Sequence, residues 1–201
     1  MALLMSQNSS SPLAHFHQLS ENTLNRRRFL KLGAMAAFAG IVPKSAFGSA
    51  GLPQPERSLA FYNTHTGERL KTVYWVQGNY ISESLGEIDY ILRDHRTNAV
   101  LNIDTRLLDL LFALGNKLDT NQPFHIISGY RSPQTNAFLH ANSDGVAENS
   151  LHLVGQAIDI RTPGRLLNTL RNAAVALKAG GVGYYPKSDF VHVDVGRVRY
   201  W

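Results

Sequence analysis

The sequence contains no cysteine among its 201 residues. This absence excludes disulfide bonds, CxxC redox chemistry, thiolate metal sites and a cysteine nucleophile. Any metal must therefore be held by histidine, carboxylate and water. The lack of cysteine also suits an oxidising compartment.

Most of the chain also lacks a surplus of positive charge. The formal net charge of +5 comes from 20 basic and 15 acidic residues. Residues 1–48 hold five of the basic residues and one acidic residue (+4), which leaves 15 basic and 14 acidic residues (+1) for the remainder. No Lys/Arg run with interleaved aromatics occurs there, so we expect no nucleic-acid partner.

The N-terminal region lacks an apolar run long enough to cross a bilayer. Its run Leu32–Val42 has 11 residues, whereas a spanning helix needs about 20. The run follows RRRFLK at 26–31 and precedes Ala46 and Gly48, small residues suited to a cleavage site. This pattern resembles a twin-arginine export signal. We expect residues 1–48 to be read by the twin-arginine export machinery, to contact the membrane only transiently and to be cleaved near Gly48. The mature protein would lie in the periplasm; an uncleaved anchor is the alternative.

After this signal we expect a linker over 49–57 and one domain over 58–201, without internal repeats. Period-2 and period-3.6 patterns predict strands and helices in alternation. The strands are expected at 58–64, 68–76, 124–127, 156–161, 182–185 and 190–195, and the helices at 80–93, 105–118, 133–140 and 165–179. We expect Ser82 and Asp104 to cap the first two helices, Leu166 to face the core, and Gly180-Gly181 to end the last helix.

Two stretches place polar side chains inside apolar strands. His152 and Asp159 lie in SLHLVGQAIDI (150–160), and His192 lies in DFVHVD (189–194). A carboxylate in a buried strand is costly unless it is paired or bound to a cation. For either stretch alone, a core histidine beside a structural ion pair is the better interpretation. The two together favour a metal held by His152, Asp159 and His192, with one position open.

Several motifs together carry a family resemblance. They are SGYRS (128–132), SxHxxGxAxDI (150–160), GGVGxYP (180–186), FVHVD (190–194) and Trp201. In order and spacing they resemble the YcbK-type murein endopeptidases, of the wider group of zinc D,D-peptidases (M15-like). The resemblance implies an α+β single domain in which an antiparallel sheet carries the zinc site and helices pack on it. It also implies hydrolysis of peptide cross-links in peptidoglycan, whose peptide stems would be the substrate.

The resemblance also assigns residues. His152, Asp159 and His192 match the zinc ligands, for one zinc per chain. Asp189 matches the acidic residue three positions before the last histidine, and Arg131 matches the substrate-polarising arginine.

The chemistry needs a general base beside the metal, since water must lose a proton and the leaving amine must gain one. Asp189 is the first candidate, and a solvated turn residue is its alternative. Asp194 alternates onto the face of His192 and is expected to orient that ring; from the sequence alone the roles of the two aspartates are interchangeable. Arg131 suits a developing oxyanion or a substrate carboxylate, and a surface ion pair is its alternative.

Two other functions fit the same residues. One is a D,D-carboxypeptidase or dipeptidase, and the other is a non-catalytic domain that binds peptidoglycan through a zinc-stabilised fold. The sequence leaves open which cross-link is cut, D-alanine to diamino acid or diamino acid to diamino acid.

Overall fold

The computed structural model describes residues 55–143 and 146–201. The predicted export signal and most of the predicted linker lie outside this part. The elements are β1 (Glu56–Asn63), β2 (Arg69–Val76), β3 (Asn79–Tyr80), α1 (Ser82–Ile91), α2 (Thr105–Lys117), β4 (Phe124–Ser128), α3 (Pro133–Asn142), the 3-10 helix η2 (Leu151–Val154), β5 (Ala157–Arg161), α4 (Leu167–Leu177), β6 (Gly181–Tyr185), β7 (Phe190–Asp194) and β8 (Arg199–Tyr200). No helix in these ranges is both long and apolar enough to cross a membrane.

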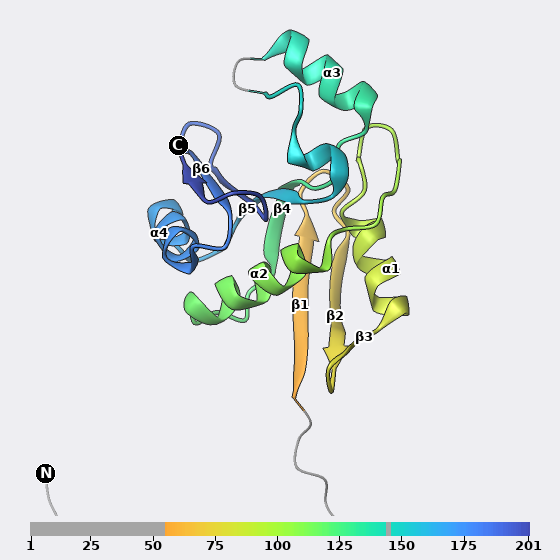
Figure 1. Ribbon diagram of the computed structural model, residues 1–201, viewed down its shortest axis with the longest axis vertical. Coiled ribbons are helices and arrows are strands. Elements are labelled where there is room, and N and C mark those ends of the chain that lie inside the picture. The colour runs from red at the N-terminus through yellow and green to blue at the C-terminus, as the bar shows by residue number, and fades with distance from the viewer. Residues whose placement is uncertain (1–54, 144–145) are drawn as a thin grey trace, which may run out of the picture. The chain divides into compact units, whose positions relative to one another are not determined.

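The strands form one open sheet in the order β3-β2-β1-β4-β5-β7-β6-β8. The α+β single domain expected from the sequence is confirmed, and the sheet is mainly antiparallel. Two of its pairs, β1 with β4 and β6 with β8, are parallel. The first of these joins the N-terminal hairpin to the strands that carry the site (Figure 1).

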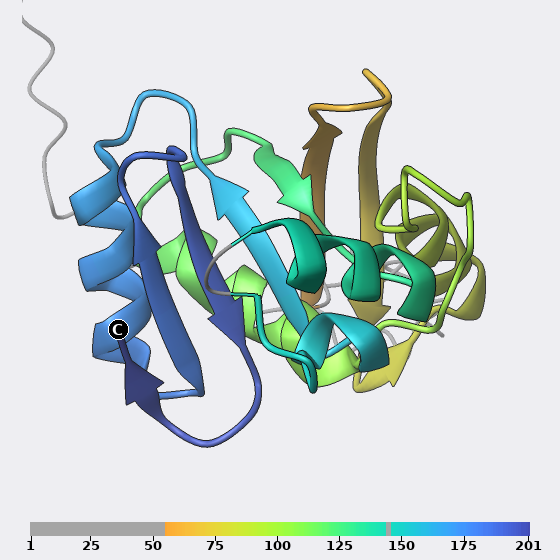
Figure 2. The ribbon, with the colours of Figure 1, turned by 90° about the horizontal axis from the view of Figure 1, so that it is seen from above.

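The two faces of the sheet have different roles. Ile158 and Ile160 of β5 and Val191 and Val193 of β7 are almost fully buried in the hydrophobic core. Because strand side chains alternate, the residues between them point to the other face. Helix α2 contacts β1 and α4, and α4 contacts β6 and β7. In Figure 2, α2 lies behind the strands while α3 and η2 lie in front of them.

Most element boundaries follow the sequence patterns, with several differences. Asp104 caps α2 as predicted, by accepting a hydrogen bond from the backbone N–H of Arg106 at 2.9 Å. Ser82 does not cap α1: the cap residue is Ile81, without a side-chain bond. Leu166 is 73% exposed because it precedes α4 rather than belonging to its inner face. Helix α4 ends on Lys178 in a left-handed conformation, before the two glycines. Strand β1 begins at Glu56, inside the predicted linker.

Helix α3 and η2 lie beyond the end of β4 (Figure 1). Ser132 caps α3 by accepting from the N–H of Thr135. The buried Asn136 of α3 donates to the carbonyl oxygens of Ala147 and Glu148, at 3.2 and 3.0 Å. These bonds fix the segment that leads into η2, where the first predicted ligand lies.

Candidate metal centre

Strand register brings two of the predicted ligands together. Asp159 of β5 and His192 of β7 are direct antiparallel partners, and both point away from the face that carries the core. His152 arrives from η2. Ser150 accepts from the His152 N–H at 3.4 Å at the start of that helix, and Gly155 ends it with a φ of +66°. The three residues are 1 to 9% exposed.

Gly155 is required by the backbone packed against it. Its positive φ is one that side-chain-bearing residues rarely adopt, and a Cβ there would lie 2.7 Å from the carbonyl oxygen of Asn102. This glycine therefore lets η2 pack against the segment before α2.

Three ligand atoms converge at one point. Nε2 of His152 lies 3.2 Å from Oδ1 of Asp159 and 3.2 Å from Nδ1 of His192, and Nδ1 of His192 lies 2.8 Å from the same Oδ1. Donors around a tetrahedral zinc with bonds near 2.0 Å are separated by about 3.3 Å. The spacing therefore fits three corners of such a site.

The outer nitrogen of each ring faces an acceptor. Nδ1 of His152 lies 2.7 Å from the carbonyl oxygen of Gly129, and Nε2 of His192 lies 3.1 Å from Oδ2 of Asp194. A carbonyl or an ionised carboxylate only accepts, so in the neutral rings these outer nitrogens carry the protons. The inner nitrogens then turn bare lone pairs toward Asp159. A cation is what such a donor set binds, and the residues fit the zinc that the sequence predicts.

The pKa directions of His152 and Asp159 agree with this description, whereas the raised pKa of His192 favours the protonated ring, with a proton in the place of a cation. Burial lowers the pKa of His152, which keeps its ring neutral at physiological pH. Burial alone would raise the pKa of Asp159, but the two neighbouring histidines outweigh it and hold that pKa well below its usual range. Burial also opposes protonation of His192, yet hydrogen bonds to Asp159 and Asp194 raise its pKa. The site thus combines one fixed carboxylate with two imidazoles, the ligand types that zinc prefers without cysteine.

Asp194 is fully buried and lies behind His192. Its Oδ1 accepts from the N–H groups of Gly181 and Gly196 at 3.0 and 2.8 Å. Arg199 contacts both of its oxygens, at 3.1 and 2.8 Å. Because this carboxylate is consumed by these bonds and lies on the far side of the ring, it orients His192 and is not placed to act as a base. The structure therefore separates the two aspartates that the sequence left interchangeable.

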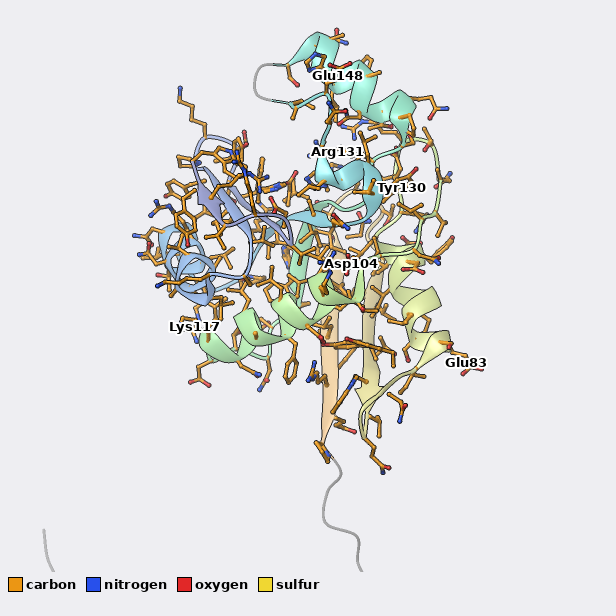
Figure 3. All side chains as sticks on the ribbon, viewed as in Figure 1. Glu83, Asp104, Lys117, Tyr130, Arg131 and Glu148 are labelled. Carbon is orange, nitrogen blue, oxygen red and sulfur yellow. The ribbon has the colours of Figure 1, made fainter. Side chains whose placement is uncertain are left out.

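Arg131 reaches the site from the turn between β4 and α3 (Figure 3). Its Nη2 donates to Oδ2 of Asp159 at 2.6 Å, and its Nε donates to Oγ of Ser128 at 3.0 Å. The predicted arginine thus contacts a predicted ligand directly. The alternative of a surface ion pair is wrong, since the pair is buried, with 12% and 4% of the two side chains exposed.

Asp189 is not brought to the ligand cluster. Its side chain is 61% exposed and accepts from Nη1 of Arg161 at 2.7 Å. Its φ of +53° places it in a left-handed turn before β7. Its neighbours Ser188 and Phe190 line the cleft over the site, whereas Asp189 itself does not. In this structure Asp189 therefore lies beside the cleft, paired with Arg161 and without a hydrogen bond to His192.

A cleft of about 420 Å³ opens over the three ligands. One wall is aromatic: Phe190 stacks on Tyr185 with ring centroids 4.6 Å apart, and Trp201 donates its indole N–H to the Tyr185 hydroxyl at 2.8 Å. The opposite side is formed by β4, α3 and the loop that carries Arg96. Another hollow, of about 500 Å³, lies between β2 and α1, and none of the three ligand residues lines it.

Comparison with known proteins decides the family. The family described as "Peptidoglycan L,D-endopeptidase MepK" matches residues 52–201. The chain belongs to this family. The Peptidoglycan L,D-endopeptidase MepK of Escherichia coli (strain K12) is 45% identical over 177 residues, which cover 88% of this chain and 97% of that protein. The Probable peptidoglycan L,D-endopeptidase MepK of Haemophilus influenzae (strain ATCC 51907 / DSM 11121 / KW20 / Rd) is 41% identical over 178 residues, or 88% and 95% of the two chains.

The MepK family match confirms the resemblance inferred from the motifs, and it spans every predicted site residue. Sequence reasoning missed two residues that hold the site in place. Asp94 bonds to Ser132 beside Arg131, and Arg199 holds Asp194. The C-terminal run RVRYW (197–201) could have indicated the role of Arg199, because its basic and aromatic residues follow His192 closely. Asp94 sits in a polar loop that gave none.

Proposed function

We propose that this protein is a zinc-dependent peptidoglycan endopeptidase. The observation that carries the proposal is the convergence of His152, Asp159 and His192 under a cleft into which Arg131 also points. The two relatives are named L,D-endopeptidases. A link between two diamino acids joins an L centre to a D centre, whereas a link from D-alanine joins two D centres. The diamino acid to diamino acid cross-link is therefore the proposed substrate.

His152, Asp159 and His192 would hold one zinc ion, which when bound supplies Lewis acidity to the scissile peptide. The chain's own groups supply the rest. Asp194 and the Gly129 carbonyl keep both rings in one tautomer. Arg131 commits Nη2 to Asp159, and its Nη1 has no hydrogen-bond partner in the described part of the chain. That N–H is the donor for the negative charge that develops on the peptide oxygen.

Asp189 is the proposed general base, which takes a proton from the attacking water and returns it to the leaving amine. The lining residues on either side place this turn at the cleft edge, and its pairing with Arg161 must open for it to act. We expect Asp189→Asn to keep zinc and to lose turnover by about 10²–10⁴-fold, the usual range for a general base. Arg161→Gln is the matched control, since it breaks the same pair but leaves the carboxylate. Full turnover in Asp189→Asn would reduce Asp189 to a surface ion-pair partner.

The proposed site of action is the periplasm, reached through the twin-arginine machinery with residues 1–48 as signal. The RRRFLK run and the following apolar stretch support this. N-terminal sequencing of the protein from a periplasmic fraction tests it. A mature terminus near Ser49 is expected, whereas an intact N-terminus in a membrane fraction would indicate an anchor.

Mass spectrometry of products from defined cross-linked muropeptides tests the activity itself. We expect chelator-sensitive cleavage of the diamino acid to diamino acid dimer and little cleavage of the D-alanine to diamino acid dimer. His152→Ala is the inactive control. Removal of only a terminal D-alanine would point to a carboxypeptidase, and binding without cleavage would point to a peptidoglycan-binding domain.

A further inference from the structure

Three arginines line the cleft over the ligand cluster: Arg96, Arg131 and Arg199. Two of them are neutralised by a buried aspartate, since Arg131 pairs with Asp159 and Arg199 pairs with Asp194. The guanidinium of Arg96 has no ion pair and no hydrogen bond within the described part of the chain. Among the described residues that line the cleft, Asp159 is the only acidic one. Within that described lining, Arg96 is the arginine whose charge has no acidic partner.

Arg96 is held in place by its backbone rather than by its side chain. The buried Asp94 accepts the N–H of Arg96 on Oδ1 at 2.9 Å. The other oxygen of Asp94 accepts the N–H and the hydroxyl of Ser132, at 2.9 and 2.6 Å. One carboxylate thus ties the segment of Arg96 to the residue that follows Arg131. The two arginines are set at a fixed spacing while the guanidinium of Arg96 stays exposed.

The wall beside Arg96 is a flat pair of stacked rings. His65 also lines the cleft, and its ring stacks on His95 with centroids 3.8 Å apart and planes 6° apart. Nε2 of His65 lies 2.9 Å from the carbonyl oxygen of Ile127, which locks the ring. Burial lowers the pKa of His95 to about 4, so that ring is neutral at physiological pH. The stack adds a rigid, flat surface beside the guanidinium of Arg96.

We propose that Arg96, backed by the His65–His95 stack, binds a free carboxylate of the substrate beside the scissile bond. This inference rests on the proposed function: the diamino diacid whose amine forms the cross-link retains a free carboxylate on the carbon that bears that nitrogen. Arginine matches a carboxylate with two parallel hydrogen bonds. Arg131 and the ligand cluster would act on the peptide bond, and Arg96 would select substrates whose carboxylate is free over those in which it is amidated.

Calorimetric binding of two peptides tests the proposal. One is a stem peptide ending in a diamino diacid, and the other is the same peptide with the carboxylate at the D centre of that residue amidated. We expect the wild-type protein to bind the acid about tenfold more tightly than the amide, as befits one charge-assisted contact. Arg96→Gln should bind both equally and weakly, and Arg96→Lys should keep part of the preference. Lys117→Gln is the control, because it removes one positive charge at the exposed end of α2 (Figure 3).

A preference for the acid that survives in Arg96→Gln would overturn the proposal, as would equal binding of both peptides by the wild-type protein. The turnover assay separates this result from the proposed function. A wild-type protein that cleaves no cross-linked dimer would contradict the function, while a binding preference that depends on Arg96 would still stand.

Discussion

Two buried carboxylates, Asp94 and Asp159, contact neighbouring residues of the turn between β4 and α3, and they differ in whether their hydrogen bonds are complete. Both are at most 3% exposed, and the pKa of each is held below its usual range. Asp94 is surrounded by donors, namely the N–H of Arg96 and the N–H and hydroxyl of Ser132. Asp159 has Arg131 on one oxygen, but its other oxygen faces the ring nitrogens of the two histidines.

The difference separates the carboxylate of the candidate metal centre from the one that serves the fold. A buried carboxylate whose hydrogen bonds are complete needs nothing further and serves the fold. A buried carboxylate that faces bare nitrogen lone pairs is satisfied only by a proton or a cation. Burial and a low pKa alone do not separate the two cases, whereas the protons available around each oxygen do.

The largest expected effect is on the side of Asp159. His152→Ala removes one of three ligands and opens a gap in the cluster. We expect loss of bound zinc and a fall in turnover of about 10³-fold or more, since the metal contributes several kcal/mol to the transition state. Metal analysis and the muropeptide assay measure both. A variant that keeps full zinc and full activity would move the metal centre elsewhere.

Arg131→Ala should be next in size. Loss of a preorganised donor to a developing oxyanion costs about 10²–10³-fold in turnover, while the three ligands remain. Zinc content should stay near the wild-type level, although Asp159 loses its partner on Oδ2. Arg131→Lys tests geometry against charge, because lysine lacks the second N–H pair. Equal activity of the alanine variant and wild type would leave Arg131 as a structural partner of Asp159.

Asp194→Asn should weaken zinc binding by about 10–100-fold, as is typical when a group that orients a ligand histidine is lost. Asp109→Asn is the matched control. Asp109 pairs with Arg57 and accepts from the hydroxyls of Tyr74 and Tyr80, so its loss should lower stability and leave the zinc affinity unchanged. Competition with a chromogenic chelator measures the affinity. Equal losses in both variants would mean that Asp194 acts only through stability.

Asp94→Asn should affect activity least and stability most. It replaces an acceptor by an NH₂ group that faces donors, at a cost of about 1.5–3 kcal/mol in the free energy of unfolding. Burial alone would raise the pKa of Asp94, but hydrogen bonds from Ser132 and from the Arg96 N–H lower it. Because the folded pKa is depressed, the stabilisation is present above the unfolded value of about 3.9 and is lost as the pH falls below it.

Urea unfolding of wild type and Asp94→Asn at several pH values measures this. The difference in free energy should be constant between about pH 5 and 7 and should shrink below about pH 4. A difference that grows on acidification would reverse the assignment, because Asp94 would then be a group whose protonated form is stabilised in the fold.

The sequence predicted the ligand cluster because its residues stand out locally. Asp159 and His192 interrupt apolar strands. The alternation in β5 and β7 already places their side chains on the other face of the sheet from those of Ile158 and Val191. The order of the motifs supplied the family. The role of Asp94 was not predicted because its partner Ser132 lies 38 residues away. In the sequence, Asp94 looks like any solvated carboxylate of a polar loop. The pairing of Asp189 with Arg161 is equally non-local, as is the parallel pairing of β1 with β4. The prediction for Leu166 was wrong because a helix start is uncertain by one or two residues, and α4 begins at Leu167.

The register of β5 on β7 has one further consequence. Asp159 opposite His192 and Ile158 opposite Val193 are the same pairing, seen from the two faces of the sheet. A slip by one residue would turn the ligands into the core and the isoleucines toward water. A chain with this register slip would therefore lose the ligand cluster, and with it the capacity to hold the proposed zinc ion. Zinc content of a preparation should accordingly report the fraction of native molecules.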